Sequence, residues 1–207
     1  MLKKNSPPSI NIKNKKPDIR HLKEMKEVVY DKNWFKKTDK DLELYYMYRG
    51  LKNKNNIRYD ITIIPPKILG VEFVKTKGHK HLKCEELYTV LRGEAIFLLQ
   101  KNKGKIVKDV YTVKVQKNEF ILIPPKYNHV TINPGPKKLK LGNWISEESK
   151  HDYEDLKKMN GACYFYIKSS SKKSKGRWIK NKNYTQIPKL RFIRANKKLP
   201  LNSPYYI

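Results

Sequence analysis

The sequence predicts an all-β protein, built as an antiparallel sandwich or a small barrel. Its apolar residues occur in many short runs of the length of single strands, separated by turns rich in glycine, proline and asparagine. Some runs, such as residues 110–115, alternate between apolar and polar side chains, as a strand does when it buries one face. Only two stretches, residues 31–37 and 151–159, have the composition of short helices.

The N-terminal part of the chain is expected to contribute short helical segments and one strand. Residues 1–16 are mostly lysine, asparagine, serine and proline, so we expect a flexible basic extension there. Asp31 can cap a short helix that ends near Lys37. Residues 43–49 predict a strand dense in tyrosine. Packing and ligand contact are equally good interpretations of its tyrosine side chains.

A series of strands follows, and one tight turn between two of them predicts a β-hairpin. Residues 51–56 are expected to form a loop. Arg92-Gly93-Glu94 separates two apolar runs, which is typical of a hairpin between paired strands. The predicted strands cover residues 57–64, 71–74, 86–91, 95–100, 110–115, 120–123, 130–132, 139–145, 162–167, 177–180 and 189–194.

Length and composition indicate a single core in a reducing compartment. A chain of 207 residues with 38% hydrophobic residues can bury one core. Its two cysteines, Cys84 and Cys163, do not make the framework of a disulfide-stabilised protein. The sequence has no apparent signal peptide and no apolar run long enough to span a bilayer. We therefore expect a cytoplasmic protein without a membrane partner.

The formal net charge of +28 first suggests a nucleic-acid partner, but the distribution of the charge argues against one. Of 47 basic residues, seven are arginine and the other 40 are lysine, and the lysines are spread along the chain. Proteins that bind nucleic acid more often cluster arginine and interleave aromatic residues. We interpret the charge as a solvated surface that also attracts small anions in a salt-dependent way.

Four residues in two separate stretches form a candidate metal site. His79 and His81 are two residues apart, so their imidazoles would share one face of a strand. Glu86 begins the next apolar run, and His129 follows a later predicted strand. Three neutral imidazoles and one carboxylate suit a first-row divalent ion such as iron, manganese, nickel, cobalt or zinc. The alternative interpretation is that these are ordinary surface or core histidines.

The spacing of these residues resembles the two sequence motifs of the cupins. The first motif corresponds to His79, His81, Glu86 and Gly93, and the second to Pro124, His129 and Asn133. Phe73, Asn118 and Lys126 stand where the motifs have glycine. Asn118 tolerates a left-handed turn, whereas Lys126 is expected to alter the loop before His129. The resemblance implies a double-stranded β-helix, or jelly roll, with short N-terminal helical segments and extra C-terminal strands.

Longer stretches resemble a narrower family, the cupin-type glucose-6-phosphate isomerases of archaea and some bacteria. The resemblance covers roughly residues 17–207. The segments that carry it are Arg20-His21-Leu22, residues 42–49, 75–81, 86–88 and 123–133, His151-Asp152-Tyr153, and residues 183–191. It implies a metal-dependent isomerase that interconverts glucose 6-phosphate and fructose 6-phosphate in glycolysis and gluconeogenesis. It also implies a homodimer and favours Fe(II) among the ions that these ligands accept.

Roles for individual residues follow from the chemistry and from this resemblance. Such an isomerase moves a hydrogen between adjacent carbons, by a base or by hydride transfer, and the sequence leaves both routes open. We expect the catalytic residues to be Glu86, His129 and Tyr88. By resemblance, the sugar phosphate would contact Thr62, Thr76, Gly78, His151 and Tyr153. One aromatic position of the family is not matched, because Ile145 stands where relatives have tyrosine.

Other functions are compatible with the same fold and ligands. The protein could be a different metal-dependent cupin enzyme, such as an epimerase or a dioxygenase, because fold and ligands do not fix a reaction. It could also be a non-enzymatic protein that binds a sugar phosphate or nucleic acid. In each case we expect residues 17–167 to form the cupin domain. Residues 168–207 would contribute a polar loop and strands that pack on the cupin body or across a dimer.

Overall fold

The structure of the protein, a computed structural model, describes residues 10–170 and 176–198. Strands dominate these residues, which confirms the predicted all-β class. The predicted N-terminal extension begins outside them, since residues 1–9 are not described. Helical structure is limited to α1 (Lys32–Lys37), α2 (Glu154–Lys158) and a 3₁₀ turn at Leu22–Met25 in the described residues. Asp31 caps α1 as predicted, because its side chain accepts a hydrogen bond from Trp34 N at 2.8 Å.

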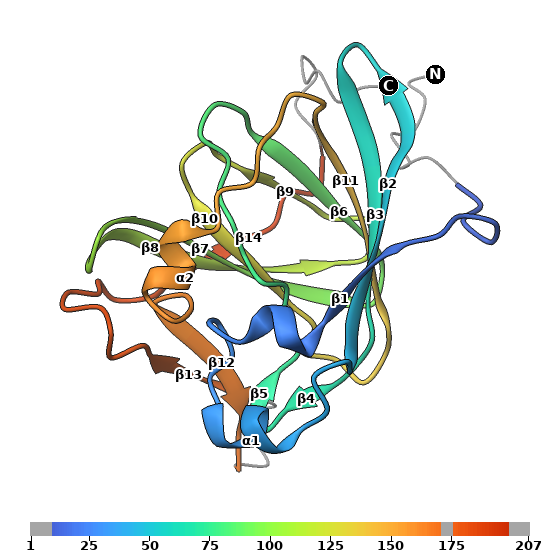
Figure 1. Ribbon diagram of the computed structural model, residues 1–207. Coiled ribbons are helices and arrows are strands. Elements are labelled where there is room, and N and C mark those ends of the chain that lie inside the picture. Colours follow the sequence, from blue (N-terminus) through green and yellow to red (C-terminus); the bar gives the residue numbers. More distant parts are fainter. Residues whose placement is uncertain (1–9, 171–175, 199–207) are drawn as a thin grey trace.

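Two larger sheets face each other across the core (Figure 1). The six-stranded sheet runs in the order β1 (Asp18–His21), β2 (Glu43–Lys54), β3 (Ile57–Ile64), β11 (Leu139–Ser146), β6 (Glu86–Arg92), β9 (Phe120–Ile123). The second runs β10 (Asn128–Ile132), β7 (Glu94–Lys103), β8 (Ile106–Gln116), β14 (Arg191–Arg194). The rings of Tyr88 on β6 and Phe97 on β7 contact each other between the sheets, 5.2 Å between centroids. Inward-facing apolar side chains of both sheets thus share one core.

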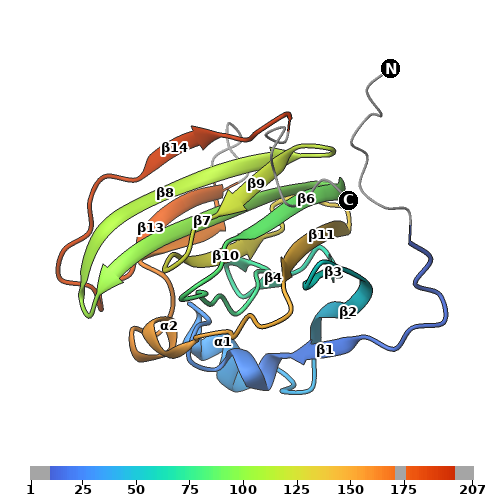
Figure 2. The ribbon, with the colours of Figure 1, turned by 90° about the horizontal axis from the view of Figure 1, so that it is seen from above.

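A third, smaller sheet closes one end of the molecule (Figure 1). Its strands are β13 (Gly176–Lys180), β12 (Tyr164–Lys168), β5 (Glu72–Phe73) and β4 (Ile68–Leu69). The C-terminal strands join existing sheets, since β13 pairs with β12 and β14 pairs in parallel with β8 (Figure 2). A division of the chain into domains at residue 168 stays a prediction.

The connectivity of the two large sheets is that of a cupin. Between β6 and β11 the chain passes repeatedly from one sheet to the other, which is the winding of a jelly roll. The predicted fold, a double-stranded β-helix, is therefore confirmed. No helix of the described residues is long and apolar enough to cross a membrane.

Two predictions of local structure are wrong. β6 and β7 do not form a hairpin, because they lie in different sheets. Gly93 has φ 85°, and a Cβ there would lie 3.1 Å from Lys138 O, so this turn sends the chain across the sandwich instead. The predicted loop over residues 51–56 is also wrong, since β2 continues to Lys54. Only Asn55 and Asn56 form the turn, both with positive φ.

Candidate active site

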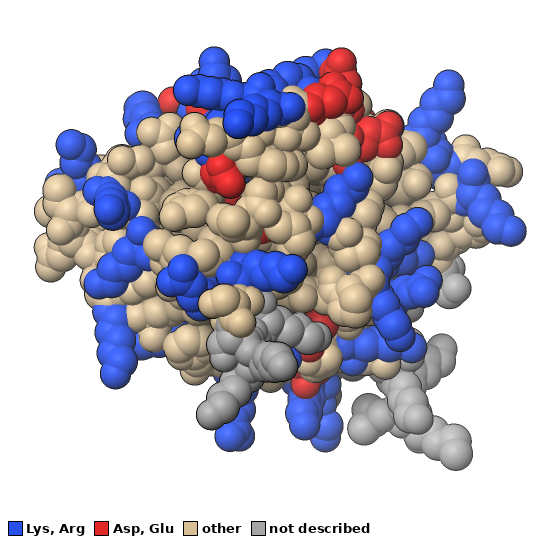
Figure 3. Space-filling view, turned by 90° about the horizontal axis from the view of Figure 1, so that it is seen from below, with Lys and Arg blue, Asp and Glu red and all other residues tan. Residues whose placement is uncertain are grey.

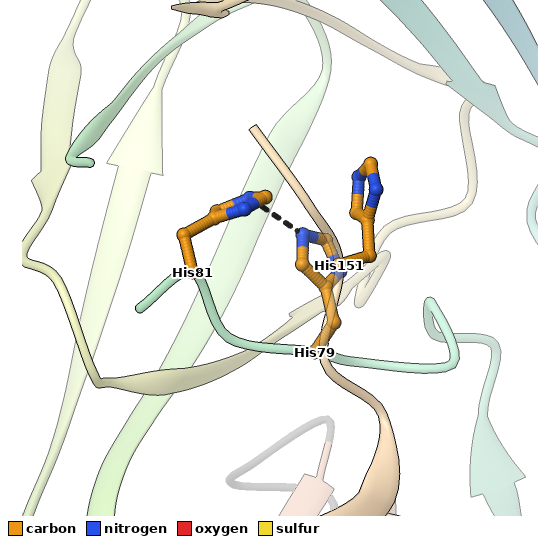
Figure 4. Close-up of side chains that lie close together, drawn as sticks. All are labelled: His79, His81 and His151. Atoms are coloured by element: carbon orange, nitrogen blue, oxygen red, sulfur yellow. Dashed lines mark hydrogen bonds between the residues drawn. The ribbon is translucent and has the colours of Figure 1, made fainter. Parts of the chain in front are cut away.

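The His79–His81 segment is extended but is held only by isolated bridges. His79 pairs with His129 on β10, where His129 N donates to His79 O at 2.8 Å. Because the backbone is extended, His79 and His81 project to the same side, as predicted (Figure 4). Their Nε2 atoms lie 3.0 Å apart.

Gly78 explains how this segment comes so close to its neighbours. Its φ is 79°, in the region that favours glycine. A Cβ at this position would lie 2.6 Å from a methyl of Leu156 on α2 and 2.6 Å from a methyl of Val130 on β10. Only a residue without a side chain lets the histidine segment pack between these elements.

The predicted metal-site residues meet at one point from both large sheets. Glu86 starts β6, and its Oε2 lies 3.3 Å from His81 Nε2, 3.4 Å from His129 Nε2 and 3.9 Å from His79 Nε2. His81, Glu86 and His129 are almost fully buried. The residues that the sequence separates by up to fifty positions are thus brought together.

The donor set fits a divalent metal ion. Among the described residues, Glu86 Oε2 and both ring nitrogens of His129 are buried without a hydrogen-bond partner. Each such group would cost about 1–3 kcal/mol if nothing compensated it. His81 Nδ1 lies 2.9 Å from Lys150 O, and because a carbonyl only accepts, this nitrogen carries the proton. In the tautomer with the proton on Nδ1, the lone pair of Nε2 points to the cluster, which is the form that binds a metal.

Burial and mutual contact set the protonation of the cluster. Burial alone would raise the pKa of the Glu86 carboxyl, but the imidazoles of His129 and His81 outweigh it and hold that pKa well below its usual range. Burial, together with the neighbouring His129, lowers the pKa of His79 well below its usual value. Burial and His81 lower the pKa of His151 to about 4. The cluster therefore holds an ionised Glu86 carboxylate near neutral pH, beside neutral imidazoles at His79 and His151.

His151 and Tyr153 reach the cluster from the segment before α2. The ring of His151 lies 4.3 Å from that of His79 and 5.0 Å from that of His81 (Figure 4). The rings of His151 and Tyr153 are nearly parallel, with centroids 6.0 Å apart. The ligand atoms of His79, His81 and His151 lie within 4.8 Å of one another, as do those of His79, Glu86 and His129.

A cavity that is partly open to solvent lies beside the cluster. Of the predicted site residues, only His81 does not line it; those that do are Thr62, Thr76, Gly78, His79, Glu86, Tyr88, His129, His151 and Tyr153. Thr76 Oγ1 accepts a hydrogen bond from Thr131 N at 3.0 Å and keeps its own proton to donate. Burial, together with Glu86, raises the pKa of Tyr88 well above its usual value, so its phenol stays protonated.

The cavity also has a cationic wall that the sequence interpretation missed. Arg20 on β1, Arg49 on β2 and Lys77 line it. Arg20 Nη1 pairs with Glu24 at 2.5 Å, while Arg20 Nε is buried without a partner among the described residues. Lys77 Nζ lies over the Tyr153 ring, 5.5 Å from its centroid. Arg20 belongs to the segment Arg20-His21-Leu22 that resembles the isomerase family, and this was the one sequence feature that pointed to a role for it.

Four further residues of the cavity wall were not predicted as site residues: Tyr45, Met47, Asp60 and Asn143. Of the two earlier interpretations, packing is confirmed for Tyr45, which is buried in the core and whose hydroxyl accepts a hydrogen bond from Lys77 N at 3.1 Å, while contact with a ligand stays a prediction. Ile145, where relatives have tyrosine, is 1% exposed and pairs with Glu86 across the sheet, but is not part of the wall.

The fold and the cluster of histidines and a carboxylate define a cupin with a candidate metal site. The family model for glucose-6-phosphate isomerase matches residues 19–189, and the chain belongs to this family.

Two similar proteins are also described as glucose-6-phosphate isomerases. The glucose-6-phosphate isomerase of Thermococcus litoralis is 29% identical over 148 residues, 69% of this chain and 76% of the relative. That of Pyrococcus abyssi is 28% identical over 141 residues, 65% of this chain and 72% of the relative. Among solved structures, the capsular polysaccharide assembling protein CapF from Staphylococcus aureus has 15% identity and a TM-score of 0.44, covering 70% of this chain and 30% of its own.

Proposed function

We propose that the protein is a metal-dependent isomerase that interconverts glucose 6-phosphate and fructose 6-phosphate. The observation that carries the proposal is one cavity that joins two kinds of wall, in a chain of the glucose-6-phosphate isomerase family. One wall holds the cluster of His79, Glu86 and His129, and the other holds hydroxyls and cations. An aldose–ketose isomerase with an anionic substrate needs both.

His79, His81, Glu86 and His129 would hold the metal ion, and Fe(II) is the ion that we propose, with manganese, nickel, cobalt and zinc as alternatives that these ligands accept. When bound, the ion polarises the oxygens of the substrate at the carbons that exchange hydrogen. His81, Glu86 and His129 are almost fully buried and His79 is partly buried, so packing should hold their donor atoms in place before substrate enters.

The neighbouring side chains supply the proton chemistry. Tyr88, kept neutral by burial, can donate a hydrogen bond to a substrate oxygen and stabilise negative charge there. Glu86 is an ionised carboxylate that lines the cavity, and we propose that it takes the proton in the enediol route. In the hydride route it acts only through its charge. We propose that His129, which faces Glu86 from the opposite sheet with Nε2 3.4 Å from Oε2, acts together with it at the reacting carbons.

The phosphate end of the substrate would lie at the hydroxyl and cationic wall. We propose that Thr62 and Thr76 donate hydroxyl hydrogen bonds and that the backbone at Gly78 lies against the substrate. His151 and Tyr153 cover the sugar from the segment before α2. Phosphate oxygens are strong acceptors, and charge-assisted bonds from Arg20 and Lys77 would add to these neutral donors.

The test is isomerase activity on fructose 6-phosphate, coupled to oxidation of glucose 6-phosphate. Protein stripped with chelator should be inactive and should regain activity with Fe(II), and the other ions are added one at a time for comparison. His129→Ala should lower kcat/KM by more than about 100-fold, the upper end of losses for outer-shell partners of a metal. His21→Ala is the matched control, because it changes a half-buried histidine of β1 that lies outside the cluster.

Each outcome separates the hypotheses. Activity that survives both chelation and His129→Ala would contradict the proposed metal site. Metal bound at the cluster without turnover of any aldose phosphate would favour another cupin enzyme or a non-enzymatic sugar-phosphate protein.

We also propose a homodimer that acts in glycolysis and gluconeogenesis in the cytoplasm. Free Cys84 and Cys163 are in keeping with a reducing compartment. Phe192 and Ile193, two neighbouring apolar residues on the edge strand β14, are 74% and 42% exposed, which suits an interface. Sedimentation should give twice the 24.6 kDa chain mass, and Phe192→Ser should lower it toward the monomer. A monomeric wild-type protein would contradict this proposal.

A further inference from the structure

Asn143 lies at the centre of a row of polar residues that crosses four neighbouring strands. It sits on β11, where its cross-strand partners are Asp60 on β3 and Tyr88 on β6. Arg49 on β2 continues the row on the far side of Asp60. All four residues line the cavity, and Asn143 is 5% exposed. A buried amide at this place needs a partner, and its partner identifies what it does.

The amide of Asn143 contacts the carboxylate of Glu86. Asn143 Nδ2 donates to Glu86 Oε1 at 2.8 Å, and both side chains are buried. The other carboxylate oxygen, Oε2, makes no hydrogen bond in the described part of the chain and faces the three histidines at 3.3–3.9 Å. One oxygen is thus engaged by the amide and the other is left for the cluster.

The last torsion of a glutamate side chain has a broad, nearly twofold energy profile. Without the amide at Oε1, this torsion is less constrained, and the oxygen that faces the histidines is held less firmly. The amide removes this freedom with one short hydrogen bond to a charged acceptor, which is stronger than a bond between neutral groups.

A neutral amide also suits the place electrostatically. Asp60 is engaged elsewhere, since its Oδ1 accepts from Gly50 N at 2.7 Å and its Oδ2 accepts from Arg58 Nε at 3.1 Å. Asn143 lies between this carboxylate and that of Glu86, because it is opposite Asp60 on the neighbouring strand and its side chain contacts Glu86. An uncharged donor between two buried carboxylates bonds to one of them without adding a like charge.

We propose that Asn143 is a positioning residue that holds the Glu86 carboxylate with Oε2 toward His79, His81 and His129. The inference deepens the proposed function, because it assumes that this cluster binds the metal ion. Asn143 would not touch the ion itself: it acts through Glu86, one of the residues that bind the ion directly.

The test measures metal affinity, independently of turnover. Zn(II) or Co(II) is titrated into stripped protein in competition with a chromogenic chelator. Asn143→Leu keeps the size of the side chain and removes the donor, so affinity should fall about 10–100-fold, as for other outer-shell partners. In a Glu86→Ala background, Asn143→Leu should cause almost no further loss, because the residue through which it acts is gone.

The matched control is Thr112→Val. Thr112 is a buried residue of β8 whose hydroxyl donates to Phe97 O at 2.9 Å, so the change removes one buried hydrogen bond away from Glu86. It should lower stability and leave metal affinity unchanged. Asn143→Ala serves as a second variant if leucine disturbs folding, with the same expected loss of affinity.

Several results would overturn the proposal. They are wild-type affinity in a folded Asn143 variant, an equal loss in the Glu86→Ala background, unfolding of both Asn143 variants, and a wild-type protein that binds neither ion. Failure of the proposed function is a different result, since a protein that binds metal with an Asn143-dependent affinity but does not isomerise fructose 6-phosphate refutes only the reaction.

Discussion

Single residues decide the chemistry of the site through the atoms that they leave free. The carbonyl of Lys150 fixes which nitrogen of His81 carries the proton, and Asn143 engages one oxygen of Glu86. Both contacts lie behind the cluster and orient the atoms that face it. The sequence motifs identified the histidines and Glu86 because these residues occur at the fixed spacing of the two cupin motifs. They could not identify Asn143, since an asparagine on an alternating strand carries no pattern of its own.

Lys126 gives a test at the residue scale. It adopts φ 67° beside the site, where its backbone N–H donates to His81 O at 2.6 Å. A left-handed conformation costs an L-residue about 1–2 kcal/mol, and glycine avoids this cost but loses some chain entropy. Lys126→Gly should therefore raise the free energy of unfolding by about 1 kcal/mol, measured as a higher midpoint in urea.

Asn118, which also has φ 67°, is the control for this prediction. Asparagine tolerates the left-handed region, so Asn118→Gly should change stability little. An equal gain at both positions would show that the effect is not the strain of the lysine backbone.

At the scale of elements, the extended histidine segment uses both of its faces. His79 and His81 face the cluster, while Lys80 between them points away and pairs with Asp155 of α2 at 2.5 Å and with Asp152 at 3.5 Å. Asn128 also donates to Asp155 Oδ2, at 3.1 Å. Backbone bonds between Lys80 and Asp152 complete the attachment. The segment that carries His151 and Tyr153 is thereby fastened over the cavity.

The ion pair of Lys80 should therefore affect substrate binding more than catalysis. Both side chains are partly exposed, so the pair contributes about 1 kcal/mol or less. Lys80→Met should raise the KM for fructose 6-phosphate by up to about fivefold with little change in kcat. In the Lys80→Met background, Asp155→Asn should raise KM almost no further, because the ion pair is already lost. Lys83→Met, at an exposed lysine of the next loop, should leave KM unchanged. A lower kcat with constant KM would contradict this role.

The elements also show where sequence interpretation ends. Alternation and turn residues located most strands, because they follow from local burial. The pairing of β6 was missed, because a glycine turn looks the same whether the next strand pairs beside the last one or crosses to the facing sheet. In the same way Arg20 and Arg49 reach the cavity only through the pairing of β1, β2 and β3, which no local pattern fixes.

At the scale of the whole molecule, the charge is dispersed. The formal net charge is +28, yet Figure 3 shows lysine and arginine scattered over one face, with uncharged surface and acidic side chains between them. Such a surface attracts a phosphorylated sugar over about one Debye length, roughly 10 Å at 0.1 M salt. On the face shown, the cations of the described residues are not gathered along one line, as binding to a nucleic-acid backbone requires.

Binding to duplex DNA should therefore be weak and should depend only modestly on salt. The logarithm of the association constant falls with the logarithm of salt concentration by about 0.9 for each phosphate contacted. Scattered lysines should engage few phosphates at once, so we expect a slope of about −3 or shallower for a 20-base-pair duplex, measured by fluorescence anisotropy. A slope of about −6 or steeper, as for proteins that contact six or more phosphates, would require a continuous basic surface and would revive a nucleic-acid role for this chain.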